Sequence, residues 1–238
     1  GISYCMMAAK LASEEKKPDG FKYKEANILI LGDSITAGDG TPSGYRYSLF
    51  EQLYASGARF KFVGPKKSIG DSRLTDKYDS HGGTGGWKIQ NLIDNVDSLC
   101  NFDYDIVLIM IGRNDAGDVV GIADRYKELL DAVLAKNPNA SIYCGDVIPK
   151  KGSSISIEMI DAALNLKLPA ICKEYTEKGS KVNFVQMSTA TWTTDMYNDA
   201  VHPNEKGNRQ IAKFFWDAIL DEVLQINDSG DNNYVEPV

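Results

Sequence analysis

The sequence is short of histidine and cysteine, and it has no long apolar run. His81 and His202 are its only histidines, which excludes a histidine-rich metal site. The cysteines lack the CxxC spacing of zinc or thioredoxin-like sites, so we expect buried thiols at Cys5, Cys100, Cys144 and Cys172. No apolar run reaches the ~18 residues of a membrane-spanning helix, so we expect no transmembrane segment.

Positive charge is also in deficit. The 238 residues carry 26 lysines and arginines against 33 aspartates and glutamates, a net charge of −7. Such a surface repels phosphate backbones and anionic lipids, so we expect neither nucleic acid nor a membrane as partner. Hydrophobic residues make up 43% and charged residues 25%, values that are typical of a globular protein with one domain or two small ones.

Composition divides the chain into three parts. Residues 1–26 are expected to form a lead-in segment, 27–226 one folded domain, and 227–238 a polar tail or the start of a linker. We expect that these termini can join the domain to other modules. The chain begins with glycine and lacks the basic and apolar regions of a signal peptide, so its start leaves open whether the protein is secreted.

Short apolar runs alternate with amphipathic segments along the folded part. Strands are predicted at 27–31, 60–63, 105–111, 140–148 and 182–186. Helices are predicted at 45–56, 87–99, 118–136, 156–178 and 205–224, the fourth of them broken near Pro169. This alternation predicts an α/β fold, a five-stranded parallel sheet inside a three-layer α/β/α sandwich. Ligands of such sheets bind beyond the carboxyl ends of the strands.

The first predicted strand ends at a turn that presents a serine. Gly32 permits a sharp turn, and Ser34 then lies at the carboxyl edge of the sheet. Alternatively, Asp33 or Ser34 only caps a helix. A GxSxG elbow is excluded because Thr36 stands at its last glycine, and a GxGxxG dinucleotide motif is excluded because Ser43 replaces the third glycine.

A glycine-rich cluster occupies residues 80–88. Its glycines let backbone N–H groups approach a ligand, so the cluster is either a flexible turn or an oxyanion donor at the start of a helix. A phosphate-binding loop is disfavoured, because Trp87 separates Gly86 from Lys88 and Ile89 follows.

Two further polar groups follow the later strands. Asn114 comes directly after the most apolar run and is either a turn residue or a donor to a developing oxyanion. Asp199 and His202 lie three residues apart before the last predicted helix, where a carboxylate can fix the tautomer of an imidazole. The alternative is that His202 is an ordinary loop residue. Together these positions supply a nucleophile, oxyanion donors and an acid–base pair.

Four blocks in this order resemble the SGNH (GDSL-type) hydrolases. They are GDSIT at 32–36, GTGGW at 83–87, GRND at 112–115 and DAVHP at 199–203. The resemblance extends from about residue 27 to residue 224 and implies a flavodoxin-like α/β/α catalytic domain. It also implies that neither a metal nor a cofactor is needed.

The resemblance assigns a role to each block. Ser34 matches the nucleophile, whose own N–H also serves the oxyanion hole, while His202 matches the general base and Asp199 its partner. Gly86 matches the glycine donor of the oxyanion hole, with Gly83 and Gly85 as neighbouring alternatives, and Asn114 matches its amide donor. Arg113 replaces the small residue that is common before this asparagine, and we expect it to add a positive charge at the rim of the site.

Within that family the chain is most similar to acetylxylan esterases of carbohydrate esterase family three. The similarity is carried by FVGPKKSIG at 62–70, the GGW turn, and HPNEKG at 202–207. It implies a secreted, extracellular serine esterase that removes acetyl groups from polysaccharides or oligosaccharides, above all acetylated xylan. A lysophospholipase or acyl-thioesterase is the first alternative, and a non-catalytic carbohydrate-binding relative is the second.

The expected activity makes demands on the surroundings of the site. We expect substrate contacts from Asp33, Arg113, Trp87 and Trp192, with core packing as the alternative for the two tryptophans. The imidazole must be neutral to act as a base, so activity is expected to fall in acid. His81 lies beside the glycine turn without a nearby carboxylate, and its replacement is expected to leave most activity.

Overall fold

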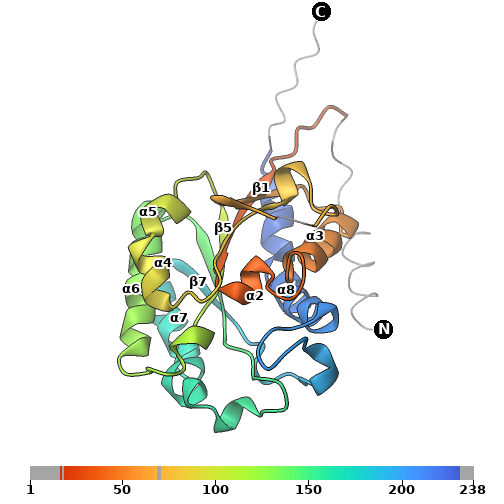
Figure 1. Ribbon diagram of the computed structural model, residues 1–238. Helices are drawn as coiled ribbons and strands as arrows, with labels where there is room; N and C mark the ends of the chain where they lie inside the picture. The colour runs from red at the N-terminus through yellow and green to blue at the C-terminus, as the bar shows by residue number, and fades with distance from the viewer. Residues whose placement is uncertain (1–16, 18, 69–70, 231–238) are drawn as a thin grey trace, which may run out of the picture.

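The computed structural model describes residue 17, residues 19–68 and residues 71–230. Its centre is a mostly parallel sheet covered by helices on both faces (Figure 1), so the predicted α/β/α sandwich is confirmed. The sheet runs in the order β3-β4-β1-β5-β6-β7, with β2 beside the first half of β1. The strands are β1 (Ala26–Gly32), β2 (Phe60–Val63), β3 (Lys66–Lys67), β4 (Ser80–Gly83), β5 (Ile106–Met110), β6 (Ser141–Gly145) and β7 (Lys181–Val185).

The described residues add two strands to the five that were predicted. β2 pairs with the first half of β1, and β4 pairs with the end of β1 on the same side, also in parallel. β3 pairs antiparallel with β4. The glycine pattern hid β4, because it carries almost no apolar side chains. A Cβ on Gly82 would lie 2.7 Å from Leu31 Cδ2, and one on Gly83 would lie 2.6 Å from the nitrogen of Ala37. These glycines are therefore packing positions within a strand, where any side chain would collide.

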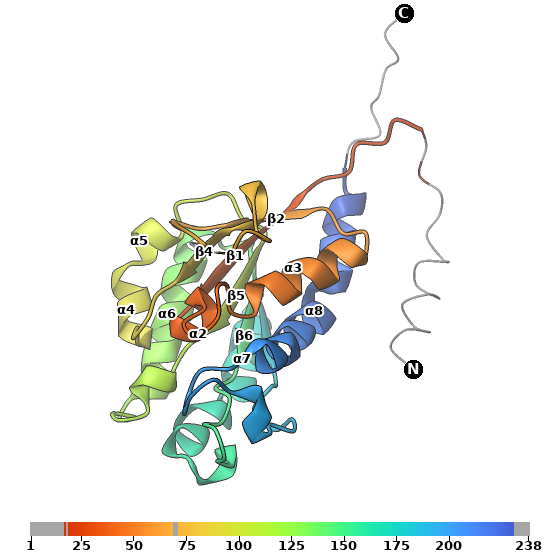
Figure 2. The ribbon, with the colours of Figure 1, turned by 45° about the vertical axis from the view of Figure 1, so that its right-hand side comes forward.

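Two helical layers enclose the sheet. α4 (Ile89–Asp94), α5 (Val96–Leu99), α6 (Ile122–Lys136) and α7 (Leu168–Glu177) cover one face, and α3 (Arg46–Ala55) and α8 (Glu205–Asp228) lie side by side on the other (Figures 1 and 2). α2 (Ser34–Ala37) follows β1 directly. The helix predicted over 87–99 is thus divided into α4 and α5. Pro169 lies in the first turn of α7, where its missing N–H costs no helical bond.

Alternation within β1 explains both layers. Leu29 and Leu31 pack in the core cluster beneath α4, α6 and α7, whereas Ile28 and Ile30 pack in the cluster beneath α3 and α8. All seven residues of β1 are buried, as expected for a parallel strand between two helical layers. Burial of each large aliphatic side chain is worth about 1.5–3 kcal/mol, so these two clusters hold the layers together.

Strand register brings the functional loops to one edge. Gly32 pairs with Met110 of β5 on one side and with Gly83 of β4 on the other. The segments that follow β1, β4 and β5 therefore leave the sheet side by side. Ser34, the glycine turn and Asn114 lie on these three segments. None of the helices among the described residues is long and apolar enough to cross a membrane.

The described residues also bear on the cysteines and on the predicted domain limits. Cys100, Cys144 and Cys172 are free and buried, as expected, and Cys5 lies outside the described residues. The division into 1–26, 27–226 and 227–238 stays a prediction. Within it, β1 begins at Ala26 and α8 ends at Asp228.

Candidate active site

Ser34 is the first residue of α2, directly beyond the carboxyl end of β1. Asp33 is the N-cap of this helix, and its Oδ1 accepts a hydrogen bond of 2.9 Å from the nitrogen of Ile35. An N–H in the first turn of a helix has no intrahelical acceptor, so the N–H of Ser34 remains available to a ligand. The local sequence thus places a hydroxyl and a free backbone donor at the same residue.

The imidazole of His202 joins the serine to a carboxylate. Its Nε2 lies 2.9 Å from Ser34 Oγ, and its Nδ1 lies 2.8 Å from Asp199 Oδ2. With Nδ1–H donating to the carboxylate, the lone pair of Nε2 faces the hydroxyl, which is the arrangement that proton removal from serine requires. The side chain of His202 is partly exposed, so a substrate can reach it.

Asp199 is held in place by its own loop. Its Oδ1 accepts hydrogen bonds from the nitrogens of Val201 (2.8 Å) and His202 (2.7 Å), while its Oδ2 faces the ring. These hydrogen bonds lower the pKa of Asp199 to about 2. The carboxylate therefore stays ionised across the pH range in which imidazole chemistry operates.

Asn114 is fixed from the other side of the site. It lies in a 3-10 turn, η2 (Arg113–Asp115), and its Nδ2 donates a hydrogen bond of 2.9 Å to the carbonyl oxygen of Trp87. The amide has a second N–H, which leaves one donor for a ligand. Asp115 ties the same turn to α4, because its Oδ2 accepts from the nitrogen of Ile89 at 3.1 Å. No pattern in the sequence indicates this anchoring role of Asp115, because its partner Ile89 is 26 residues away.

The glycine turn offers two backbone donors rather than three. The N–H of Gly83 donates to His81 Nδ1 at 3.0 Å and is therefore occupied. Among the described residues, the N–H groups of Gly85 and Gly86 donate to no protein acceptor. A Cβ at Gly85 would lie 4.0 Å from Ser34 Cβ, whereas one at Gly86 would have no neighbour within 4 Å. The Cβ direction of Gly85 thus faces the serine, and the assignment of Gly86 as the donor stays a prediction.

His81 belongs to β4 and is 4% exposed. Its Nδ1 accepts the Gly83 hydrogen bond, and burial lowers the pKa of His81 to about 3. The ring is therefore neutral and structural, and it lies within the strand rather than beside the serine.

A buried arginine supports the helix that carries Ser34. Arg46 is fully buried at the start of α3, and its Nε and Nη2 donate to the carbonyl oxygens of Thr36 (2.8 Å) and Ala37 (3.0 Å). Its Nη1 donates to Ser68 Oγ. A lone arginine in an amphipathic segment is typical of a surface position, so the sequence carried no signal for this contact.

Two residues predicted to contact substrate have other surroundings. Arg113 is buried, and its guanidinium donates to Glu158 Oε2 at 2.6 Å and to the carbonyl oxygen of Ile148. The expectation that Arg113 adds a positive charge at the rim of the site is therefore wrong. Its guanidinium lies below the surface, where the carboxylate of Glu158 compensates the charge. Asp33 is 2% exposed and caps α2, so its place is structural rather than at the substrate surface. Burial raises the pKa of Asp33 to about 6.

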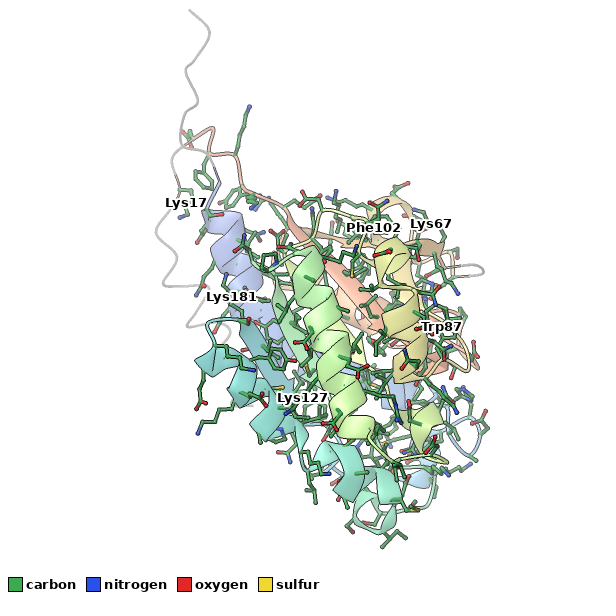
Figure 3. All side chains as sticks on the ribbon, turned by 90° about the vertical axis from the view of Figure 1, so that its left-hand side faces the viewer. Lys17, Lys67, Trp87, Phe102, Lys127 and Lys181 are labelled. Atoms are coloured by element: carbon green, nitrogen blue, oxygen red, sulfur yellow. The ribbon has the colours of Figure 1, made fainter. Side chains whose placement is uncertain are left out.

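The two tryptophans are half-buried. Trp87 lies beside α4 (Figure 3) and packs against the core cluster beneath α4 and α6. Lys66 Nζ lies 5.7 Å from the centre of the Trp87 ring. Trp192 packs against the opposite cluster, and its Nε1 donates to the carbonyl oxygen of Met187 at 2.9 Å. Both therefore contribute to packing, and their role as sugar platforms stays a prediction.

The fold and the hydrogen-bonded side chains at its strand ends are those of the SGNH class of hydrolases. A sequence profile of the GDSL-like Lipase/Acylhydrolase family matches residues 30–210, and the chain belongs to this family. It is therefore a GDSL-like esterase or acylhydrolase. A comparison with curated protein sequences gives no match.

Several solved structures of carbohydrate and acetyl esterases are similar to this chain. A family 3 carbohydrate esterase of Clostridium thermocellum is 28% identical, with a TM-score of 0.74 over 86% of this chain and 100% of that one. A carbohydrate esterase family 3 protein of Talaromyces cellulolyticus is 28% identical, with a TM-score of 0.73 over 84% and 99%. An acetyl esterase variant solved with an acetate ion is also 28% identical, with a TM-score of 0.73 over 84% of this chain and 99% of that one.

Proposed function

We propose that the protein is a serine esterase that removes acetyl groups from carbohydrates, most of all from acetylated xylan. The observation that carries the catalytic part is the continuous hydrogen-bonded path from Asp199 through His202 to Ser34. The 28% identity to carbohydrate esterases of family 3 over their whole length supports the substrate class. An extracellular location stays a prediction.

The reaction begins at the ester carbonyl. His202 takes the proton of the Ser34 hydroxyl as its oxygen attacks, and Asp199 stabilises the imidazolium that forms. The N–H of Ser34, the amide of Asn114 and the turn at Gly85 and Gly86 donate to the oxyanion. Each such donor is worth on the order of 10²–10³ in rate. His202 then protonates the sugar oxygen, which leaves as a hydroxyl. In the second step His202 takes a proton from water as the water attacks the acyl-enzyme, and acetate is released from Ser34.

A non-catalytic relative is disfavoured by the intact geometry. Such a protein needs none of the four polar groups, yet Ser34, Asn114, Asp199 and His202 are all present and oriented. A lysophospholipase or thioesterase would act on substrates with a long acyl chain instead of an acetyl group, and the experiment below distinguishes these two activities.

The test compares acyl and alcohol groups. We expect acetate release from acetylated xylan, and faster hydrolysis of 4-nitrophenyl acetate than of the octanoate. Ser34→Ala is expected to lose nearly all esterase activity and to retain the circular dichroism spectrum of the wild type. The control is Ser98→Ala on α5, which replaces an exposed serine and leaves the rate unchanged. Octanoate hydrolysis faster than acetate hydrolysis, without acetate release from any acetylated sugar, would contradict the proposed substrate class.

A further inference from the structure

A cavity of about 250 Å³ lies between the first turns of α3 and α8. The loop that joins α2 to α3 closes one side of it, through Thr41 and Ser43. This volume is just below the ~300 Å³ at which sites for drug-sized ligands begin, so it suits a single small ring. None of the residues placed above in the proton path or among the oxyanion donors lines it.

Asn208 lines the cavity with a buried amide that is only partly hydrogen-bonded. The residue is 2% exposed, and its Nδ2 donates to Thr41 Oγ1 (3.2 Å) and to the carbonyl oxygen of Pro203 (3.3 Å). Because a carbonyl only accepts, the contact with Pro203 fixes the orientation of the amide. Its Oδ1 is then buried and accepts no hydrogen bond from the described residues. Such an atom costs about 1–3 kcal/mol, so what the cavity offers a ligand comes from the other polar groups of its lining.

The other polar groups of the lining balance in charge. Arg73 is already paired, with Asp71 at 2.9 Å and with Glu205 at 3.3 Å. Arg209 has no ion pair among the described residues, and Glu51 only accepts the hydroxyl of Tyr47 at 3.1 Å. Two guanidinium groups thus face two carboxylates, which favours a neutral ligand.

The lining is more polar than apolar. Tyr47 supplies its one aromatic ring, and the guanidinium of Arg73 covers that ring at 3.8 Å from the centroid. An acyl chain would bury more polar than apolar surface there. Sugar hydroxyls both donate and accept, so they match a wall of amide, hydroxyl, carboxylate and guanidinium groups.

The cavity shares a wall with the proposed catalytic loop. A Cβ on Gly40 would lie 3.8 Å from His202 Cβ, and Asn198 Nδ2 donates to the carbonyl oxygen of Gly40 at 2.7 Å. Thr41 is the next residue, so its Cα lies within roughly 9 Å of His202 Cβ. The cavity and the proposed catalytic loop are therefore neighbours, connected through residues 40 and 41.

We propose that this cavity binds a sugar ring of the same carbohydrate whose acetyl group is removed at Ser34. The inference rests on the proposed function for the reaction, but the binding of a sugar at the cavity is measurable without the reaction. It gives the enzyme a preference for oligosaccharides over single acetylated sugars.

The kinetic test uses two variants of the lining. Ser48→Phe fills the cavity from α3, and Arg209→Ala removes an unpaired donor from α8. The readout is kcat/KM on acetylated xylotriose divided by kcat/KM on 4-nitrophenyl acetate. We expect this ratio to fall about tenfold in each variant, the equivalent of one hydrogen bond to a charged group. Lys213→Ala, one turn further along α8 and outside the lining, is the control and keeps the wild-type ratio.

Calorimetry with unacetylated xylotriose separates this proposal from the proposed function. Binding to the wild type that Ser48→Phe weakens supports the cavity site, even if no acetylated sugar is hydrolysed. An unchanged kinetic ratio in both variants overturns it, as does binding of glycerophosphocholine in place of the trisaccharide. If Ser48→Phe fails to fold, the ratio and the binding of Arg209→Ala decide alone.

Discussion

At the scale of single residues, Asp199 performs two tasks with one carboxylate. One oxygen closes its own loop through the nitrogens of Val201 and His202, and the other orients the imidazole. The lowered pKa of Asp199, about 2, keeps this carboxylate ionised at mildly acidic pH. A loss of activity at mildly acidic pH is therefore not expected to come from protonation of Asp199.

Asp199→Asn tests this division of tasks. The amide oxygen retains a bond to the loop, but an amide nitrogen facing Nδ1 favours the wrong tautomer of His202. We expect kcat to fall by about 10²–10⁴ at every pH, because a neutral side chain cannot stabilise the imidazolium. Steady-state rates on 4-nitrophenyl acetate from pH 5 to pH 9 measure the effect.

Asp195→Asn is the matched control for that substitution. Asp195 lies in the same loop and pairs with the exposed Lys206, so its replacement is expected to change kcat less than twofold, as for a weak surface ion pair. A fall in the control as large as that in Asp199→Asn would show that the loop, and not the imidazole, had been perturbed.

At the scale of elements, α2 is a four-residue helix that depends on α3 for support. The last carbonyl oxygens of α2 have no intrahelical donors. Arg46, the first residue of α3, donates hydrogen bonds to two of these oxygens, those of Thr36 and Ala37. The hydroxyl of Thr36 is also bonded to Tyr45 at 2.7 Å. The position of Ser34 is therefore set by a neighbouring helix, since four residues form too short a helix to be stable alone.

Arg46→Met tests this support. It leaves the carbonyl oxygens of Thr36 and Ala37 without donors, and we expect a loss of about 2–5 kcal/mol in the free energy of unfolding. We also expect a lower kcat in the variant that remains folded, because α2 is then less fixed. Urea unfolding and steady-state rates give the two readings.

Arg59→Met is its control, because the exposed guanidinium of Arg59 only covers the ring of Tyr23. A change within ~0.5 kcal/mol is expected there. Equal losses of stability in the two variants would exclude a special role for Arg46.

At the scale of the whole molecule, one side chain joins three distant segments. Asn227 is 3% exposed near the end of α8 and accepts a hydrogen bond from the nitrogen of Arg59 at 2.9 Å. Its Nδ2 donates to the carbonyl oxygens of Lys24 (2.8 Å) and Arg59 (2.7 Å). The segments before β1 and β2 are thereby fastened to the last helix, at the end of the sheet away from Ser34.

Asn227→Ala is expected to lower the free energy of unfolding by about 1–3 kcal/mol, since the nitrogen of Arg59 and the carbonyl oxygen of Lys24 lose this partner, while the carbonyl oxygen of Arg59 keeps the nitrogen of Ala26. Thermal or urea unfolding measures the change, and Asn183→Ala, which removes a 3.3 Å bond at an exposed position, is the control. A loss no larger than that of the control would support the predicted domain limit at residue 226. The expected loss would place Asn227 within the folded domain.

Local sequence was enough for much of the fold and for the core of the site. Strands β1, β5 and β6 are apolar runs between polar loops, and a parallel sheet follows from their alternation with helices. Asp199 and His202 are three residues apart, so their contact needs no distant part of the chain. Ser34 follows its strand directly, and strand ends meet at one edge of a parallel sheet.

Other features depend on contacts that sequence distance hides. β4 is a strand only because Gly82 and Gly83 fit against β1 and α2, and a glycine run by itself predicts a turn. Arg113 lies below the surface because Glu158, 45 residues later, compensates its charge. The nearness of Gly85 to Ser34 depends on how the turn after β4 is placed, which no spacing rule contains.

The sequence by itself determined the alternation of five apolar strands with helices, the pairing of Asp199 with His202 and the place of Ser34, because each depends on neighbours within a few residues. Tertiary structure alone decided the support of α2 by Arg46, the burial of Arg113 and Asp33, and the cavity around Asn208. Each of these joins groups from elements far apart in the chain, where charge compensation and hydrogen-bond satisfaction depend on packing rather than on local pattern.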